Sequence, residues 1–487
     1  MWTEPNIDLR SALSRRGFFS QVGSGLMGVA LADLLARDGT AAESTAAAID
    51  PHAPVAHKIY DVLPKQPHFP PRAKAVIQLF MNGGPSQMDL LDPKPALEKY
   101  AGQKFPGAID VQQPELSGGL LKSPFRFAAH GQSGIEVSEI MPHLAGCVDH
   151  LTMVRSMFTE HINHEPALWM MHTGRTLPGR PSIGAWTTFG LGTENQNLPA
   201  YVVLDDPLGL PIDGIRNWSS AWLPPVYQGT RFRAEGTPVW NLNPHRGLPR
   251  ELEDSRRKLL SALDEQHRQA RPDEPELDAR ISSYELAARM QLSATDALDL
   301  SQETAETREM YGINNPASAS YGRRCLMARR LVERGVRYVQ LYINEQIWDD
   351  HSDLEKRIRE SCLRTDQPSA ALVQDLARRG LLEDTLVIWG GEFGRLPISQ
   401  SANGRDHNRQ GFTIWMAGGG VKAGYVHGAT DEFGYAATEN RMSVTDLHAT
   451  ILHLLGLDYK RLIYRRNGLD ERLTSTFEPR IVSELLA

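Results

Sequence analysis

Five polar side chains could together bind a metal ion, because they fall just after separate predicted strands and could converge in one cleft. They are Asp350, His351, Glu392, Asp406 and His407. Two imidazoles with two or three carboxylates suit zinc, manganese or iron better than calcium or magnesium. Alternatively, these residues only stabilise turns, with Asp406 a turn former and His407 a hydrogen-bonding neighbour of the site. Glu392 has the strongest case for a function, because a carboxylate after Gly-Gly at a strand end has little structural purpose of its own.

Alternating strands and helices would position these residues. Continuous apolar runs that end in Gly, Asp, Asn or a loop predict buried parallel strands at residues 73–84, 201–207, 336–343, 385–391 and 412–420. Helical patterns that close on Gly cover residues 323–335 and 367–381. This alternation predicts an α/β fold, a three-layer α/β/α sandwich with a mostly parallel central sheet, whose ligands gather at the carboxyl ends of the strands. A charged, helix-favouring stretch at about 249–311 predicts a helical insertion beside the sheet.

The amino-terminal residues predict an exported protein. The phrase SRRGFF, residues 14–19, is similar to the twin-arginine export signal, and an apolar run and the small residues TAAESTAAA follow it. The alternative is a short amphipathic helix with a chance arginine pair, since Asp33 interrupts the run. The run is also shorter than the about 20 residues that a permanent membrane anchor needs. We therefore expect a signal peptide at residues 1–47, a linker at 48–72, and a periplasmic or extracellular location.

Composition indicates a globular protein with a large buried core. The chain has 487 residues, 41% of them hydrophobic and 23% charged, and a net charge of −7, which argues against a nucleic-acid partner. One α/β domain is predicted at residues 73–460, followed by a C-terminal extension at 461–487. Cys147, Cys325 and Cys362 form no CxxC pair, so neither a thiolate zinc site nor a disulfide framework is predicted. One disulfide or three buried thiols both fit this spacing.

The segment NHEPALWMMHTGR, residues 163–175, resembles the active-site helix of sulfatases. Sulfatases carry a Cys or Ser, then a Pro two residues later and Thr-Gly-Arg further on. Pro166 and Thr173 to Arg175 keep that spacing, and His164 stands at the nucleophile position. His164 is therefore a candidate metal ligand, general acid or base, or covalent nucleophile. Because imidazole changes the reach of the attacking atom, a metal-activated water is favoured over covalent attack. A polar helix start packed under the site is the structural alternative.

A series of longer phrases runs in order from about residue 73 to 460. They are FMNGGPSQMDLLDPKP, HTGR, WDDHSD, GGEFGRLP, GRDHN, AGGGVKAGYVHGATDEFGY and DLHATILHLLGLD. These phrases resemble the bacterial, planctomycete-type family called domain of unknown function 1501, which is related to the alkaline phosphatase and sulfatase superfamily. The resemblance implies an alkaline phosphatase-like fold with one or two divalent metal ions at the strand ends, held by Asp and His.

Comparison with the superfamily assigns positions one by one. Where the superfamily has Ser-Asp-His-Gly after a strand, Glu392 matches the Asp and Phe393 replaces the His. His407 matches the second His of the superfamily, which precedes the next strand. Asp350 and His351 match the Asp and His that follow the corresponding phosphatase strand.

Other positions depart from the superfamily or add anion binders. Asn82 stands where phosphatases carry a metal-binding Asp, and it offers only an uncharged amide oxygen. Asp89 and Asp92, on the following loop, could compensate as metal ligands. Arg175 and Arg395 are candidate binders of phosphate, sulfate or carboxylate, because the planar guanidinium suits these anions.

Together these residues predict an exported, metal-dependent hydrolase of an anionic ester, a sulfate or phosphate carried by a small molecule or a polysaccharide. The metal would polarise the ester oxygen and lower the pKa of a bound water. The alternative is a non-catalytic binding or assembly protein of the cell envelope that reuses the fold, which the departures at Asn82, His164 and Phe393 favour. Neither a nucleic-acid partner nor a permanent membrane anchor is expected.

Overall fold

The computed structural model describes residues 60–233, 250–271, 274–344 and 346–487. The chain divides into two compact units, Met1–His57 and Lys58–Ala487, and every described residue belongs to the second unit. The predicted twin-arginine signal at residues 1–47 and residues 48–59 of the predicted linker lie outside the described residues. Within the described ranges, no helix is both long and apolar enough to cross a membrane.

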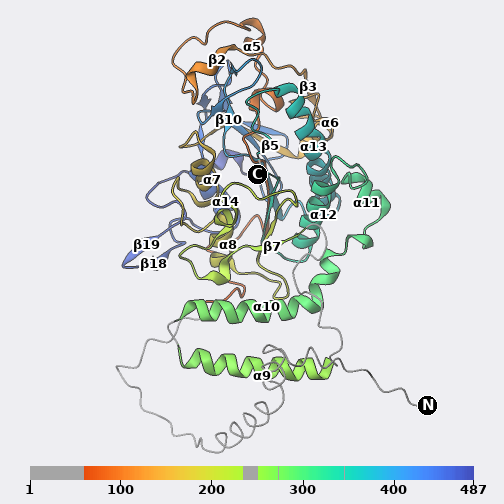
Figure 1. Ribbon diagram of the computed structural model, residues 1–487, viewed down its shortest axis with the longest axis vertical. Coiled ribbons are helices and arrows are strands. Elements are labelled where there is room, and N and C mark those ends of the chain that lie inside the picture. The colour runs from red at the N-terminus through yellow and green to blue at the C-terminus, as the bar shows by residue number, and fades with distance from the viewer. Residues whose placement is uncertain (1–59, 234–249, 272–273, 345) are drawn as a thin grey trace, which may run out of the picture. The chain divides into compact units, whose positions relative to one another are not determined.

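A nine-stranded sheet forms the centre of this second unit (Figure 1). Its strands are β1 (Ala75–Phe80), β5 (Leu151–Phe158), β6 (Tyr201–Leu204), β7 (Thr230–Phe232), β8 (Tyr338–Tyr342), β9 (Thr385–Gly390), β13 (Phe412–Ala417), β14 (Tyr425–His427) and β17 (Met442–Ser443). Eight of them follow the order β14-β5-β13-β9-β1-β8-β6-β7, and β17 pairs with β5. β13 is antiparallel to both β5 and β9, and the other pairs of this sheet are parallel.

The mostly parallel sheet predicted from the apolar runs is confirmed. The predicted strands correspond to β1, β6, β8, β9 and β13. β5 is absent from the prediction because Arg155 and Ser156 interrupt its apolar run. It lies between β14 and β13, and its carboxyl end leads toward α7 (His164–Thr173).

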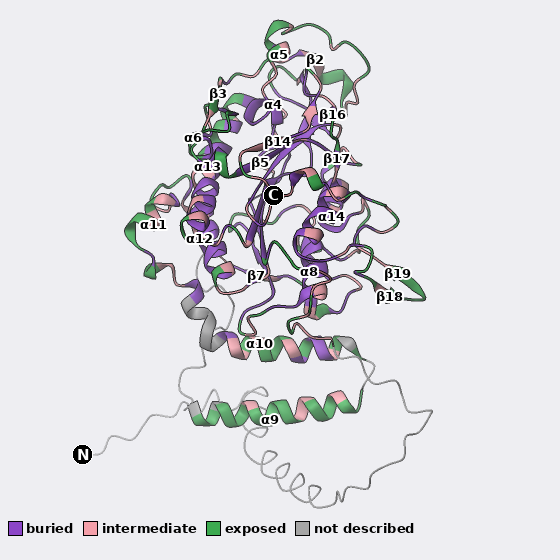
Figure 2. Ribbon diagram, turned by 180° about the vertical axis from the view of Figure 1, so that it is seen from behind, coloured by how far each residue is buried: buried purple, intermediate pink, exposed green. Residues whose placement is uncertain are grey.

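Helices cover both faces of the sheet, which confirms the predicted three-layer sandwich (Figures 1 and 2). One layer contains α6 (Pro142–Ala145), α12 (Ala319–Glu333) and α13 (Leu354–Arg378), and the other contains α7, α8 (Ile183–Leu191) and α14 (Val444–Leu454). Side chains of β1 alternate between the two layers, as the pleat of a strand requires. Ile77 and Leu79 belong to one buried cluster, and Val76 and Phe80 belong to the other.

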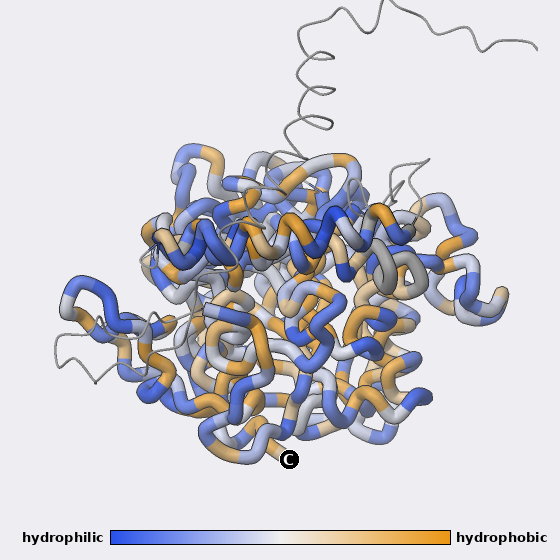
Figure 3. Tube along the Cα trace, turned by 90° about the horizontal axis from the view of Figure 1, so that it is seen from below, coloured by the Kyte–Doolittle hydropathy of each residue, from blue (hydrophilic) through white to orange (hydrophobic). Residues whose placement is uncertain are grey.

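The stretch predicted as a helical insertion is helical. It contains α9 (Arg250–Gln269), α10 (Pro275–Leu298), the 3-10 helix η5 (Leu300–Gln302) and α11 (Ala305–Met310). α10 buries Ala279, Ile281 and Met290, whereas Leu259 and Leu260 of α9 are exposed. Seen from below, the long helix at the front carries hydrophobic positions among hydrophilic ones (Figure 3).

Shorter elements complete the fold. They are α4 (Gln87–Leu90), α5 (Pro95–Lys99), β2 (Ser117–Leu120), β3 (Phe127–His130), β4 (Ile135–Ser138), β10 (Gly394–Arg395), β11 (Ile398–Gln400), β12 (His407–Asn408), β15 (Ala429–Thr430), β16 (Ala437–Glu439), β18 (Tyr464–Arg466) and β19 (Leu469–Glu471). Leu473, Val482 and Leu485, within the predicted C-terminal extension, are buried in the layer of α7, α8 and α14. The three cysteines are buried and free.

Candidate metal centre

Loops at one edge of the sheet bring the candidate residues together. Asn82, Asp349 and Glu392 follow the carboxyl ends of β1, β8 and β9, and His164 begins the helix that comes after β5. His407 precedes β13, and because β13 runs antiparallel, its amino end lies at the same edge. Parallel strands therefore collect these side chains at their carboxyl ends, as the sequence predicts for this fold.

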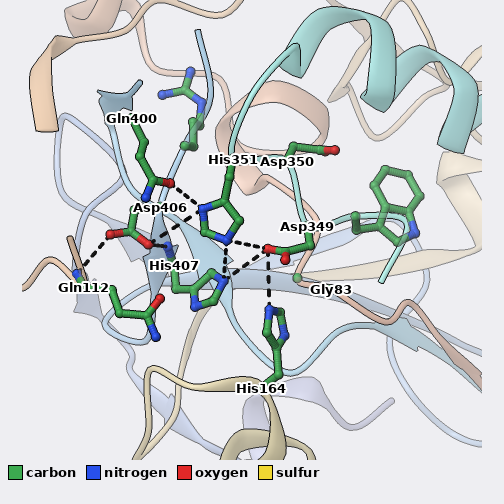
Figure 4. Close-up of polar contacts among 12 residues, drawn as sticks. Gly83, Gln112, His164, Asp349, Asp350, His351, Gln400, Asp406 and His407 are labelled. Carbon is green, nitrogen blue, oxygen red and sulfur yellow. Dashed lines mark hydrogen bonds and ion pairs between the residues drawn. The ribbon is translucent and has the colours of Figure 1, made fainter. Parts of the chain in front are cut away.

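One carboxylate oxygen lies at the centre of a cluster of three imidazoles (Figure 4). Asp349 Oδ1 lies 2.9 Å from His351 Nε2, 3.1 Å from His407 Nε2 and 3.4 Å from His164 Nε2. The Nε2 atoms of His351 and His407 are 3.0 Å apart. Three nitrogen atoms surround this oxygen atom, and the four residues come from the loop after β8, the segment before β13 and the start of α7.

The other ring nitrogen of each imidazole is held by an oxygen atom. Nδ1 of His164 donates to Glu392 Oε1 at 2.6 Å, and Nδ1 of His407 donates to the Ile162 carbonyl at 2.8 Å. Nδ1 of His351 hydrogen-bonds Gln400 Oε1. Metal-binding histidines commonly donate one N–H to a carboxylate or carbonyl in this way, which fixes the ring and leaves the other nitrogen for the metal. All three rings therefore turn Nε2 toward the cluster.

The spacing of the cluster fits a metal ion. A cation held tetrahedrally at about 2.0–2.1 Å from each ligand keeps the ligand atoms about 3.3 Å apart. The distances from Asp349 Oδ1 to the three Nε2 atoms, 2.9 to 3.4 Å, lie around this value. His164 Nε2 is buried and makes no well-aligned hydrogen bond within the described part of the chain. Loss of the Nε2 proton would free this atom to bind a metal, and the N and O donor set fits zinc, manganese or iron.

Neighbouring charges set the protonation of the cluster. Burial lowers the pKa of His164, but the carboxylates of Asp349 and Glu392 outweigh this effect and raise it to about 9. Burial, with the charges of Arg395 and His164, lowers the pKa of His407 to about 4 although Asp349 raises it. Burial alone would raise the pKa of Asp349, but Arg395 and the imidazoles hold it well below its usual value. One cationic and one neutral imidazole thus face the same carboxylate.

Glu392 is held by both the backbone and His164. The Gly83 N–H donates to Glu392 Oε1 at 2.9 Å. Gly83 has a φ of +107°, and a Cβ there would lie 2.7 Å from the Asp349 backbone nitrogen, so only glycine fits between the two loops. Glu392 Oε2 is buried without a hydrogen-bond partner among the described residues. The side chain predicted as the best candidate is thus fully buried and leaves one oxygen atom unpaired.

The structure corrects the choice of aspartate after β8. Asp350 was predicted as the metal ligand, but its side chain points away from the three imidazoles (Figure 4). Its Oδ1 accepts from Arg357 Nε at 2.9 Å, and burial raises its pKa to about 6. The adjacent Asp349 occupies the cluster instead. Successive residues of this turn point in different directions, which the phrase WDDHSD does not reveal.

The two predicted anion binders have other partners. Arg395 is fully buried and donates to the carbonyls of Gly84 and Trp348 and to Asp349 Oδ1 at 2.7 Å. It therefore connects the loops after β1 and β8 and orients Asp349. Its guanidinium is occupied by these contacts and is not open to an anion. The Arg175 guanidinium lies over the Phe477 ring, 4.9 Å from its centroid. The structure thus gives Arg175 a packing partner outside the cluster.

The predicted ligands near β1 separate into two cases. Asn82 Nδ2 donates to the Ile343 carbonyl at 2.6 Å, and Asn82 Oδ1 is buried without a partner in the described ranges. An oxygen atom thus remains available at the end of β1. Asp89 is fully buried and forms an ion pair with Arg405, with Oδ2 2.7 Å from Nε, and it also accepts from Ser86. This pairing, which the sequence does not indicate, makes Asp89 a structural residue.

Asp406 and Phe393 shape the surroundings of the cluster. Asp406 Oδ2 accepts the Gln112 N–H at 2.9 Å, Oδ1 accepts the His407 N–H at 2.8 Å, and Oδ1 lies 4.0 Å from His351 Nδ1. His351, Asp406 and His407 could form a second group of metal ligands. The Phe393 ring lies 4.8 Å from the His164 ring and 4.6 Å from the His407 ring, between centroids. A hydrophobic ring therefore covers one side of the site.

Some residues of the site were missing from the sequence prediction. Asp349 is the central carboxylate, and Gln400 and the Ile162 carbonyl fix two of the rings. The only available signal for Asp349 was its place beside Asp350 and His351 in WDDHSD. Gln400 and Ile162 carry no sequence signal, because an amide and a backbone carbonyl occur on every kind of loop. A cavity of about 600 Å³ lies at the amino ends of β6 and β7, away from this cluster.

A family model matches most of the chain. The model of the DUF1501 family, proteins of unknown function, matches residues 73–486. The chain belongs to this family. The match includes the cluster, the sheet and the insertion, and confirms the resemblance seen in the sequence phrases. No curated protein is significantly similar in sequence to the chain.

Several solved structures are distantly similar to the chain. The PsFucS1 sulfatase from Pseudoalteromonas sp. is 13% identical, with a TM-score of 0.33, over 79% of this chain and 68% of that chain. The lipoteichoic acid synthase LtaP from Listeria monocytogenes is 10% identical, with a TM-score of 0.34, over 84% and 76%. The alkaline phosphatase of the Antarctic bacterium TAB5 is 12% identical, with a TM-score of 0.30, over 80% and 99%. At such TM-scores, the function must be argued from the site itself.

Proposed function

We propose that this protein is a metal-dependent hydrolase of an anionic ester, a sulfate or a phosphate. The observation that carries the proposal is the convergence of the three Nε2 atoms of His164, His351 and His407 on Asp349 Oδ1, at 2.9 to 3.4 Å. His164, Asp349 and His407, whose ligand atoms lie within 4.8 Å of one another, would hold a divalent cation, with His351 beside them. Zinc, manganese or iron is preferred to calcium or magnesium. When bound, the cation supplies a Lewis acid for the ester oxygen and activates water.

The surrounding residues prepare the ligands for this role. Glu392, Gln400 and the Ile162 carbonyl keep the imidazole protons on Nδ1, so that Nε2 stays available. Arg395 fixes the Asp349 carboxylate through Oδ1 and the adjacent backbone. His164 and His407 are buried, whereas the His351 side chain is 34% exposed. Substrate would therefore approach from the side of His351.

The anionic ester class rests on the charge of the site and on the spacing in α7. His164 would be cationic near neutral pH before a metal binds, because its pKa is raised to about 9. Metal binding would displace the Nε2 proton of His164, so the site is cationic both before and after the metal binds and attracts a negatively charged ester. The spacing of Pro166 and Thr173 to Arg175 after His164 resembles that of sulfatases, and the substrate would be carried by a small molecule or a polysaccharide.

A non-catalytic binding protein of the cell envelope is the second candidate. Phe393 favours it, because its ring packs on His164 and His407 where the superfamily has a histidine ligand. Nδ1 of His164 is also committed to Glu392, which argues against free movement of this ring as a nucleophile. Such a protein would hold an anionic ligand at the metal without turnover.

Export is part of the proposal. The phrase SRRGFF at residues 14–19 supports the twin-arginine route and a periplasmic or extracellular location. Replacement of Arg15 and Arg16 by lysine should retain the protein in the cytoplasm. Fractionation of cells that express both forms would test this expectation.

Metal analysis and activity assays test the proposed function together. The purified chain is dialysed against zinc, manganese or iron, its metal content is measured by mass spectrometry, and aryl phosphates and aryl sulfates are assayed. We expect about one metal ion per chain or more, and turnover that a chelator removes and metal restores. His407→Ala should lose both metal and turnover. Stoichiometric metal without turnover on any ester would favour the binding protein, and absence of both would refute the hydrolase.

A further inference from the structure

A second polar cavity lies beside the turn that carries Asp349. It has a volume of about 210 Å³ and opens between the loop after β8 and α13. The polar side chains that line it are Asn344, Gln346, Arg357, Glu360, Ser361 and Arg364. It is separate from the cluster, because none of the three imidazoles lines it.

Several hydrogen-bond donors of this cavity have no partner in the described part of the chain. Asn344 is 8% exposed, yet its side-chain amide bonds to no described residue. Gln346 Nε2 is buried and unpaired as well. Arg364, partly buried on α13, forms no ion pair or hydrogen bond with a described residue. Because an unpaired buried donor costs free energy, Gln346 Nε2, with the unused donors of Asn344 and Arg364 beside it, points to a ligand that supplies acceptor oxygen atoms.

The charges of the cavity favour an anion. Two arginines, Arg357 and Arg364, line it, and among the described lining residues the one carboxylate is that of Glu360, which is exposed. Arg357 Nε donates to Asp350 Oδ1 at 2.9 Å, and its Nη2 donates to the Asp349 carbonyl at 3.2 Å. The Arg364 guanidinium is therefore the cation with the most unused donors. A planar guanidinium matches the oxygen atoms of sulfate, phosphate and carboxylate in pairs.

Ser361 contributes less than the other polar residues. Its hydroxyl already donates to the Ile347 carbonyl at 3.0 Å, which fixes the loop against α13. This bond holds Ile347, the residue after Gln346, against α13.

We propose that this cavity binds an oxyanion, the sulfate, phosphate or carboxylate group of a ligand. Arg364 pairs with two of its oxygen atoms, and the amides of Asn344 and Gln346 donate to the others. Arg357 joins the cavity to the cluster, because the same guanidinium also contacts the Asp349 backbone. In the hydrolase proposed above, the ligand is a substrate that carries a second anion beside the reacting ester. That extension rests on the proposed function, whereas oxyanion binding does not.

Titration of inorganic sulfate and phosphate into the full chain tests the cavity. The protein is kept in chelator so that the metal cluster cannot contribute, and heat of binding is measured by calorimetry. We expect one saturable site, and at least a tenfold loss of affinity in Arg364→Gln. Asn344→Leu, of similar volume, should weaken binding severalfold. Arg308→Gln removes the same charge from α11, outside the lining, and should bind as the unchanged protein does.

Folding and source of the anion are controlled separately. Unfolding temperatures measured without anion show whether each variant is folded. If Arg364→Gln does not fold, Arg364→Lys replaces it in the titration. Unchanged affinity in folded Arg364→Gln and Asn344→Leu would overturn the proposal, as would sulfate binding that appears only with metal and disappears in His407→Ala.

The source of the anion is tested with two aryl esters, one of which carries a second sulfate. If Arg364→Gln raises the KM for the ester with two sulfates but not for the monoester, the anion is a group of the substrate. Competition by free sulfate without that difference identifies a free anion. Loss of metal uptake counts against the hydrolase and leaves the sulfate titration valid.

Discussion

Helix α7 carries a buried histidine at each end, and the two differ in charge. His164, at the start of the helix, faces Asp349 and Glu392, and its pKa is raised to about 9. In the last turn, Nδ1 of His172 lies 3.0 Å from Gln340 Nε2, and Nε2 of His172 lies 3.2 Å from the Tyr342 hydroxyl oxygen. Burial, with the charge of His448, lowers its pKa to about 3.

The difference shows what turns a buried histidine into a functional one. Both rings lose water, which favours the neutral form. Only the ring at the carboxyl edge has carboxylates to compensate, and that edge is where the loops of a parallel sheet converge. The ring at the other end packs on Phe80 of β1, with 4.5 Å between ring centroids, and serves the core. The neighbouring charged groups, and not burial or residue type, therefore determine whether a buried histidine is cationic or neutral.

The largest change in the free energy of unfolding is expected when His164, the cationic residue at the start of α7, is replaced. His164→Gln leaves Glu392 buried without its cation, which should lower the free energy of unfolding by about 3–5 kcal/mol in the metal-free protein. His172→Gln should cost only about 1–3 kcal/mol, because it removes neutral hydrogen bonds. Denaturant unfolding in chelator measures both. Equal losses in the two variants would contradict the comparison, and adding Glu392→Gln to His164→Gln should recover part of the loss.

Exchanging the central carboxylate should affect metal binding most. Asp349→Asn should lower the affinity for zinc by at least about 100-fold, because a charged ligand becomes neutral. Asp350→Asn is the matched control, since the neighbouring side chain pairs with Arg357. Calorimetric zinc titrations compare the two variants. A larger loss in Asp350→Asn would restore the assignment made from sequence alone.

The pH dependence of stability should separate the two ends of the helix. His172 and His448, with pKa values lowered to about 3 and about 4, bind protons more readily when unfolded. Stability should therefore fall as pH drops below about 6.5, by up to about 1.4 kcal/mol per unit for each histidine. His164 acts in the opposite direction, and its contribution is lost as pH rises from about 6.5 toward 9.

Variants assign the two limbs of this profile. In metal-free protein followed by denaturant unfolding, His172→Gln should flatten the acid limb and His164→Gln the alkaline limb. An alkaline limb that survives in His164→Gln would show that another group carries it.

The smallest effect is expected at Arg175, just beyond the end of α7. Arg175→Gln removes a cation-π contact with Phe477 at a partly exposed position, worth about 0.5–1 kcal/mol. Metal affinity and turnover should stay unchanged. A turnover loss of tenfold or more, with metal content intact, would return Arg175 to the role of an anion binder.

Much of the fold was predictable because its signals are local. β1, β8, β9 and β13 are continuous apolar runs that end in glycine or polar residues, and helical patterns lie between them. The position of Glu392 after such a run also predicted its place at the sheet edge. The sequence did not predict β5, because Arg155 and Ser156 interrupt its apolar pattern. In the structure β5 lies inside the sheet and pairs with β13 and β14.

The site was only partly predictable because direction and partners are not local. Asp349 and Asp350 are neighbours in one turn, and only the folded turn decides which of them faces the imidazoles. Arg395 and Asp89 are an arginine and an aspartate of ordinary appearance in the sequence. Their partners come from segments about 300 residues away, as in the contacts of Arg395 with Gly84 and of Asp89 with Arg405.

The sequence by itself determined the alternating elements, the residue types at the strand ends and the family of the chain. The tertiary structure alone decided which carboxylate joins His164, His351 and His407, and which imidazole is charged. The physical reason is that hydrophobic periodicity is written into neighbouring residues, whereas a pKa and the direction of a side chain depend on atoms that folding brings from distant parts of the chain.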